Sequence, residues 1–158
     1  MKRLFALVLS LALLLSLAPV QAEKPYAGTE LRVLLANHMW SNALEPHLKE
    51  FEELTGIKLN VEMYAEDQLS QKLAIELAGQ SKDLDVFMTR PLQEAKQMIA
   101  NGWLYDVTPL LNDPEMDKAD FFEATLALYN NGEQYYGIPL VTEREILYYR
   151  TDLFEEAG

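Results

Sequence analysis

The chain has 158 residues, of which 49% are hydrophobic, so it is long enough to bury the core of about one domain. It contains no cysteine, which excludes disulfides, thiolate metal sites, a cysteine nucleophile and a lipid-modified N-terminal cysteine. Acidic residues outnumber basic ones by 25 to 13, which gives a net charge of −12. Because a chain of this charge is repelled by phosphate backbones, we expect no nucleic-acid partner.

The first 22 residues have the pattern of a removable secretion signal. A basic start at 1–3 precedes an apolar stretch over 4–18, and Val20 and Ala22 place small residues where a signal peptidase cuts. An uncleaved membrane anchor is the alternative, but the apolar stretch is shorter than the roughly 20 residues that a spanning helix needs. We therefore predict cleavage after Ala22 and a mature protein that is not embedded in the membrane.

Apolar periodicity predicts three strand–helix units in the first part of the mature chain. Near-continuous or alternating apolar runs indicate strands over 29–36, 57–63 and 84–88. Apolar stripes with three- and four-residue spacing indicate a helix after each strand. The first helix is expected to begin at Ser41 or Asn42 and end at Gly56, with Pro46 in its first turn. The second is expected from Asp67 to Gly79 and the third from Pro91 to Gly102. This alternation predicts an α/β fold with a mostly parallel sheet flanked by helices.

The pattern is weaker after residue 102. An acidic surface turn is expected over 112–120 and a further helix over 121–129. A tight turn at 130–132 leads into two more predicted strands, over 135–140 and 146–149. Thr151 or Asp152 is expected to cap a last helix.

Catalytic and metal-binding motifs are weak in this sequence. His47 and Glu50 lie three residues apart, which could serve a metal ion, but an exposed polar helix face also explains them. Asp83 and Asp85 could resemble the paired acids of a glycosidase, but they precede the third strand, whereas ligands gather at the carboxyl ends of parallel strands. We therefore expect no catalytic residues, no metal and no cofactor.

Polar and aromatic residues follow each predicted strand at its carboxyl end. They occur at 37–42 after the first strand, at Tyr64, Glu66 and Asp67 after the second, at Thr89 and Arg90 after the third, and at 142–145 between the last two. Amides, carboxylates and a guanidinium can bind hydroxyl groups, and an aromatic ring can cover the apolar face of a sugar. The combination suits a polyhydroxylated ligand, although loops are often polar without binding anything.

Longer stretches of the sequence carry a family resemblance. They are LKEFEELTGIK (48–58), DLDVFM (83–88), NGWLYDVTPLL (101–111) and YGIPLVTEREILYYRTDLFEEAG (136–158), with EDQLSQKL (66–73) similar to polyol and sugar binders. Together they resemble the family 1 extracellular solute-binding proteins of sugar-type ABC importers. The resemblance implies a periplasmic-binding-protein-like first lobe over 23–158, incomplete and truncated after the first hinge crossover, because family members are longer.

The resemblance also implies a function and a set of site residues. Such proteins close on a sugar or polyol in the periplasm and deliver it to an ABC permease in the inner membrane. The expected ligand-binding residues are Asn37, His38, Trp40, Asn42, Glu66, Asp67, Arg90 and Glu143. Tyr148 and Tyr149 fall at the expected hinge.

Two other functions stay open at this point. A secreted carbohydrate-active enzyme would need a pair of acids in one cleft. The available acids are Glu66, Asp67, Glu143 and Glu145. A periplasmic ferric-iron binder would use phenolates, and the candidate pairs are Tyr135 with Tyr136 and Tyr148 with Tyr149.

Overall fold

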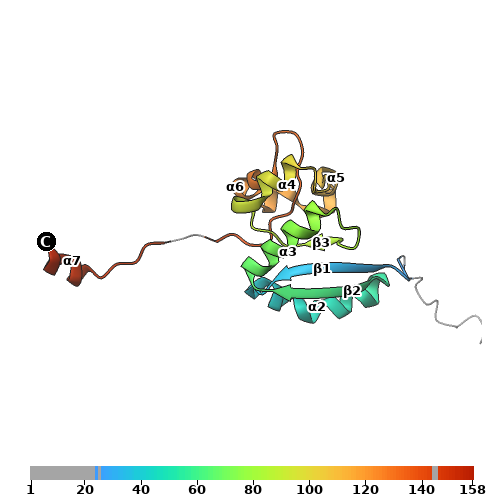
Figure 1. The fold of residues 1–158 in the computed structure, drawn as a ribbon, viewed down its shortest axis with the longest axis horizontal. Coiled ribbons are helices and arrows are strands. Elements are labelled where there is room, and N and C mark those ends of the chain that lie inside the picture. Colours follow the sequence, from blue (N-terminus) through green and yellow to red (C-terminus); the bar gives the residue numbers. More distant parts are fainter. Residues whose placement is uncertain (1–23, 25, 144–145) are drawn as a thin grey trace, which may run out of the picture.

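A small parallel β-sheet lies at the centre of the structure, a computed structural model that describes residues 24, 26–143 and 146–158 (Figure 1). Its strands are β1 (Glu30–Ala36), β2 (Lys58–Tyr64) and β3 (Val86–Phe87), in the order β2-β1-β3. Both pairings are parallel, with Val33 opposite Val61 on one side and Val86 on the other. The predicted α/β class and parallel sheet are confirmed. The expected signal peptide, 1–22, lies outside the described residues.

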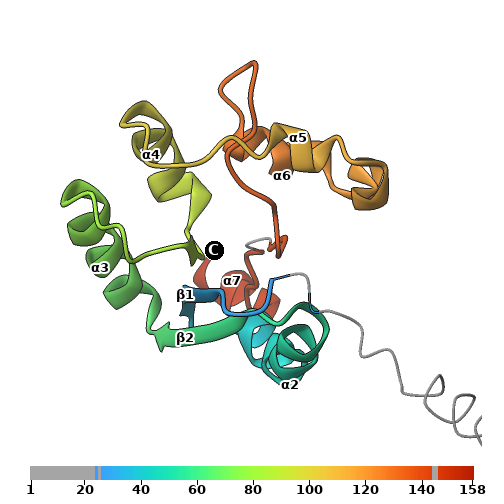
Figure 2. The same cartoon turned by 90° about the vertical axis from the view of Figure 1, so that its right-hand side faces the viewer.

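Helices cover both faces of the sheet. Helix α2 (Met39–Thr55) lies on one face, and α3 (Glu66–Ala78) lies on the other (Figure 2). A π-helical turn, η1 (Pro91–Ala95), continues into α4 (Lys96–Ala100) on the α3 side. The remaining helical segments are α5 (Thr108–Leu111), the short 3₁₀ turns Pro114–Met116 and Lys118–Asp120, α6 (Glu123–Leu126), the 3₁₀ turn η4 (Ala127–Tyr129) and α7 (Thr151–Ala157).

The core lies between the sheet and α3. Alternate residues of β1 point to opposite faces, so Leu34 and Ala36 share the α3 face. They pack with Leu69 and Leu73 from α3 and with Met98 from α4. Leu34 and Leu73 are completely buried. This packing fixes the start of α3 beside the carboxyl ends of the strands.

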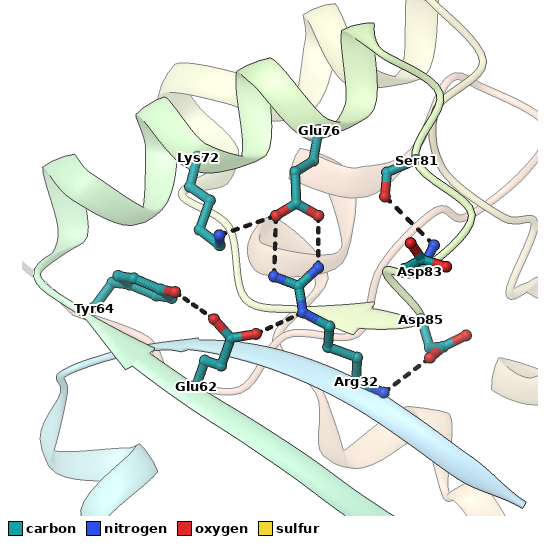
Figure 3. Close-up of polar contacts among 8 residues, drawn as sticks. All are labelled: Arg32, Glu62, Tyr64, Lys72, Glu76, Ser81, Asp83 and Asp85. Carbon is teal, nitrogen blue, oxygen red and sulfur yellow. Dashed lines mark hydrogen bonds and ion pairs between the residues drawn. The ribbon is translucent and has the colours of Figure 1, made fainter.

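An ionic network on the same face also joins α3 to the sheet (Figure 3). The Arg32 guanidinium in β1 donates to Glu76 of α3 at 2.8 and 3.0 Å and to Glu62 of β2 at 2.5 Å. Lys72 pairs with Glu76 at 3.1 Å, and the Tyr64 hydroxyl donates to Glu62. Two cations therefore balance two carboxylates at this position in the sheet.

The helix starts differ from the sequence prediction. His38, in extended conformation, is the N-cap of α2, and its Nδ1 accepts from the Trp40 amide at 3.2 Å, so neither Ser41 nor Asn42 is the cap. Because α2 begins at Met39, Pro46 lies inside the helix and not in its first turn. Ala65, and not Asp67, is the N-cap of α3. Asp67 lies in the first turn, where its negative charge interacts favourably with the helix dipole.

The C-terminal part contains fewer regular elements than predicted. The strands expected over 135–140 and 146–149 are wrong: within the described residues the first has one bridge, from Tyr135 to Asn130, and the second none. A strand needs a partner for its backbone groups, and Pro139 has no amide to donate. The helix expected over 121–129 is split into α6 and η4. Arg150, and neither Thr151 nor Asp152, occupies the N-cap position of α7.

Candidate functional site

The loops that follow the three strands begin side by side at one edge of the sheet. The Asn37 amide, directly after β1, donates to the Tyr64 carbonyl at the end of β2 at 2.7 Å. The Met88 amide, directly after β3, donates to the Leu34 carbonyl of β1 at 2.9 Å. These hydrogen bonds hold the candidate site loops next to one another, as expected for the carboxyl edge of a parallel sheet.

Arg90 is the centre of a polar cluster at this edge. Its Nη1 donates to Asp67 Oδ1 at 3.0 Å, and its Nη2 donates to Ser70 Oγ at 2.8 Å. Asp67 and Ser70 both come from the start of α3, so the cluster joins the loop after β3 to the loop after β2. A small pocket lies here, lined by Ala36, Glu66, Leu69, Ser70, Met88, Thr89, Arg90 and Glu94. The expected residues Glu66, Asp67 and Arg90 therefore lie together.

The charges of this cluster stabilise one another. Burial lowers the pKa of Arg90, but the hydrogen bond to Asp67 and the charges of Glu94 and Asp67 outweigh it, so the pKa lies above its ordinary value. Burial raises the pKa of Glu94, but hydrogen bonds from Ser70, Thr89 and the Arg90 amide together lower it by more than burial raises it. The pKa therefore lies below its ordinary value, and Glu94 is ionised at neutral pH. The pocket therefore presents a fixed guanidinium between carboxylates.

A second contact at this edge joins the loop after β1 to Glu143. His38 Nε2 lies 2.9 Å from Glu143 Oε1. Because His38 Nδ1 accepts from the Trp40 amide, the neutral imidazole carries its hydrogen on Nε2 and donates it to Glu143. Trp40 is half-buried beside this pair, at the start of α2. Among the described residues, no hydrogen bond or ion pair joins this group to the Arg90 cluster.

The remaining expected residues lie outside these two groups. Asn37 and Asn42 are exposed at the same edge of the sheet. Tyr148 and Tyr149 are exposed in a segment that extends away from the sheet toward α7 (Figure 1), and the Tyr149 ring packs edge-on against Phe154 at 5.0 Å. Their assignment as hinge residues stays a prediction.

Sequence reasoning missed Ser70 and Glu94, and it did not include Thr89 among the expected ligand-binding residues. All three line the pocket, and Ser70 and Thr89 donate to the Glu94 carboxylate. Ser70 and Glu94 both fall on predicted helices whose assignment rests on apolar spacing alone. The available signal was the position of Glu94, one turn after Arg90 at a proline-initiated helix start.

The features considered for other functions are engaged elsewhere in the structure. His47 Nδ1 and Glu50 Oε2 lie 3.6 Å apart on an exposed helix face, and the described residues contain no group of three metal-ligating side chains. Lys118 Nζ lies 4.2 Å from the centre of the Tyr135 ring, and the Tyr136 hydroxyl donates to Gln134 at 2.9 Å. Among the described helices, none combines the length and apolarity needed to cross a membrane.

Comparison with known proteins shows the family. The model of the family described as "Bacterial extracellular solute-binding protein" matches residues 40–158, and the chain belongs to this family. It is 28% identical to the erythritol/L-threitol-binding protein of Mycolicibacterium smegmatis, over 84% of this chain and 30% of that protein. It is 31% identical to the arabinooligosaccharide-binding protein of Bacillus subtilis, over 96% of this chain and 36% of that protein.

A solved structure supports the same fold. An ABC transporter solute-binding protein from Agrobacterium radiobacter K84, in complex with ribitol, superposes with a TM-score of 0.67 at 25% sequence identity. The superposition covers 73% of this chain and 30% of that one. The chain thus spans about a third of the length of the relatives it matches.

Proposed function

We propose that the protein binds a polyol or a small sugar in the periplasm and delivers it to an ABC permease in the inner membrane, without catalysing a reaction. Membership of the extracellular solute-binding family supports this proposal. The relatives named for erythritol or L-threitol and for arabinooligosaccharides, and the structure with ribitol, support the choice of a polyhydroxylated ligand.

The observation that carries the proposal is the Arg90 cluster at the carboxyl edge of the sheet. Vicinal hydroxyl groups need donors and acceptors at fixed positions, which the Arg90 guanidinium and the carboxylates of Asp67 and Glu66 provide. Trp40 adds an aromatic surface for C–H groups of the ligand. The pocket is smaller than most ligand sites, so we infer that this chain supplies one wall of the site.

The carboxylates at this edge support binding over hydrolysis. Asp67 is held by Arg90 and Glu143 by His38, so both serve as partners of fixed donors. A glycosidase needs one acid that keeps its proton near neutral pH and a second carboxylate at a set separation. The pKa of Glu94 lies below its ordinary value, so Glu94 is ionised at neutral pH and does not serve as such a proton donor.

The periplasmic location rests on the proposed signal peptide over 1–22. Cleavage would leave Glu23 as the first residue of the exported protein. N-terminal sequencing of the protein from a periplasmic extract tests this step, and a protein that still begins at Met1 would contradict it.

Calorimetry with the complete translation product that carries this chain tests the function. We expect saturable binding of erythritol, ribitol or an arabinooligosaccharide. The Arg90→Gln substitution removes charged hydrogen bonds, and because such bonds are worth about 1.5–3 kcal/mol each, affinity falls roughly tenfold or more.

Glu53→Gln is the matched control, because Glu53 lies on the exposed face of α2 and, among the described residues, forms an ion pair only with Lys49, at 3.6 Å. It should leave the affinity unchanged. Release of reducing sugar from a glycoside without saturable binding would favour the enzyme. A coloured complex with ferric iron would favour the iron binder.

A further inference from the structure

Glu94 occupies the inner side of the Arg90 cluster. Its carboxylate, 15% exposed, accepts hydrogen bonds from the hydroxyls of Ser70 and Thr89. It also accepts from the Arg90 backbone amide at 3.0 Å, and its Oε1 lies 3.5 Å from Arg90 Nε. One side chain thus contacts the start of α3, the loop after β3 and both the backbone and the side chain of Arg90.

The π-helical turn η1 brings Glu94 into this position. In a normal helix start, a Glu three residues after the N-cap residue reaches back to the N-cap amide. Here Arg90 is the N-cap residue, and the wider turn lets Glu94, four residues later, make that contact. π-Helical turns are rare and concentrate at functional sites, because they reposition a side chain that a regular helix would direct elsewhere.

These contacts fix the direction of the Arg90 side chain. Ser70 Oγ donates to Glu94 and accepts from Arg90 Nη2, so it forms a hydrogen-bonded bridge between the Glu94 carboxylate and the end of the guanidinium. Arg90 Nε is buried and has no hydrogen-bond partner within the described residues, and Glu94 is the carboxylate beside it. Asp67 holds the opposite edge of the same group through Nη1.

We propose that Glu94 is a positioning residue, which presets the Arg90 guanidinium for the hydroxyl groups of the ligand without touching the ligand itself. The inference rests on the proposed function. A long side chain that is already ordered loses less conformational freedom when a ligand binds. Ordering of Arg90 by Glu94 therefore increases the affinity for the ligand. The charge of Glu94 also stabilises the positive charge of a guanidinium whose Nε is buried, before the ligand arrives.

A double-mutant cycle in the complete translation product tests this inference, with erythritol, ribitol and an arabinooligosaccharide as calorimetric probes. We expect Glu94→Gln to weaken binding roughly tenfold, and Arg90→Gln with Glu94→Gln together to be no weaker than Arg90→Gln alone. Additive losses would overturn the inference, because a residue with a separate structural role weakens binding independently of Arg90. Glu53→Gln is the control and should not change the affinity.

A ligand-free measurement gives a second, independent result. The ¹⁵N signal of Arg90 Nε, assigned by its loss in Arg90→Gln, should be distinct and slow to exchange in the unsubstituted protein and in Glu53→Gln. In Glu94→Gln and Ser70→Ala it should move to the position of exposed arginines, and an unchanged signal would overturn the inference. Failure of the unsubstituted protein to bind any of the three probes would contradict the proposed function, whereas binding with additive losses contradicts only the role of Glu94.

Discussion

At the scale of single residues, Arg32 shows how a charge can be stable in the middle of a strand. Hydrogen bonds to Glu76 and then to Glu62 raise the pKa of Arg32. The hydrogen bonds from Arg32 in turn lower the pKa of both carboxyls below their ordinary value of 4.5. An isolated charge on this face would oppose packing of α3, but the network satisfies it.

The network predicts a loss of stability in acid. Because the folded pKa of Glu76 lies below its unfolded value, its contribution is fully present above about pH 4.5 and is lost as the pH falls through the folded pKa. We expect Glu76→Gln to lower the free energy of unfolding by about 1–3 kcal/mol at pH 7 and to flatten its dependence on pH below 4.5. Urea unfolding at several pH values measures both effects.

The control for this prediction is Glu53→Gln, which removes an exposed ion pair with Lys49 and should change the free energy of unfolding by less than about 0.5 kcal/mol. Parallel pH profiles for Glu76→Gln and the unsubstituted protein would show that the Arg32 network contributes nothing to acid stability.

At the scale of elements, the sequence predicted the pieces that depend on local pattern. The three parallel strands follow from apolar periodicity, and Gly56 ends α2 as expected, with a left-handed φ of 80°. The start of α2 was wrong because a histidine imidazole replaced the usual Ser or Asn cap. The strands over 135–140 and 146–149 were wrong because strand formation depends on a partner, which local pattern does not encode.

The same division applies to the candidate site. The rule that ligand residues gather at the carboxyl ends of parallel strands predicts that Asp67 and Arg90 lie at the same edge of the sheet, and Arg90 Nη1 lies 3.0 Å from Asp67 Oδ1. The π-helical turn that turns Glu94 toward Arg90 has no sequence period of its own, so Glu94 could not be assigned from the pattern.

Gly56 should be less tolerant of substitution than another glycine with positive φ. A Cβ at Gly56 would lie 2.8 Å from Lys24 Cβ and 3.0 Å from Ala27 Cα, whereas a Cβ at Gly28, with φ +90°, meets nothing within 4 Å. Both alanine variants incur the backbone strain of about 1–2 kcal/mol. Gly56→Ala alone adds a steric clash, so it should melt at the lower temperature, and equal melting temperatures for the two variants would contradict this.

Pro46 inside α2 predicts a stabilising substitution. A proline in a helix interior removes a backbone hydrogen bond and crowds the preceding turn, at a cost of about 3 kcal/mol relative to alanine. We therefore expect Pro46→Ala to raise the midpoint of urea unfolding. Pro114, at the first position of its 3₁₀ turn, is the control, because proline is favourable there and Pro114→Ala should give no gain. A lower midpoint for Pro46→Ala would contradict this prediction and would mean that proline at this position stabilises the fold.

At the scale of the whole molecule, the folded layers and the C-terminal segment differ in burial. The sheet, α3 and α4 enclose the apolar core, whereas residues 146–158 extend away from it and are exposed throughout (Figure 1). The apolar side chains exposed in this segment are Ile146, Leu147, Tyr148, Tyr149, Leu153 and Phe154. Several exposed apolar side chains in one short segment favour association more than single exposed apolar residues do.

We therefore expect the 158-residue chain to self-associate through residues 146–154 as its concentration rises. Its net charge of −12 opposes association, and because salt screens that repulsion, association should strengthen between about 0.01 and 0.15 M salt. Leu147→Asp, at a side chain that is 87% exposed, should shift sedimentation toward the monomer. Ile75→Asp introduces the same change at an isolated exposed residue of α3 and should have no such effect. Equal shifts from the two variants would mean that net charge, and not the C-terminal apolar segment, controls association.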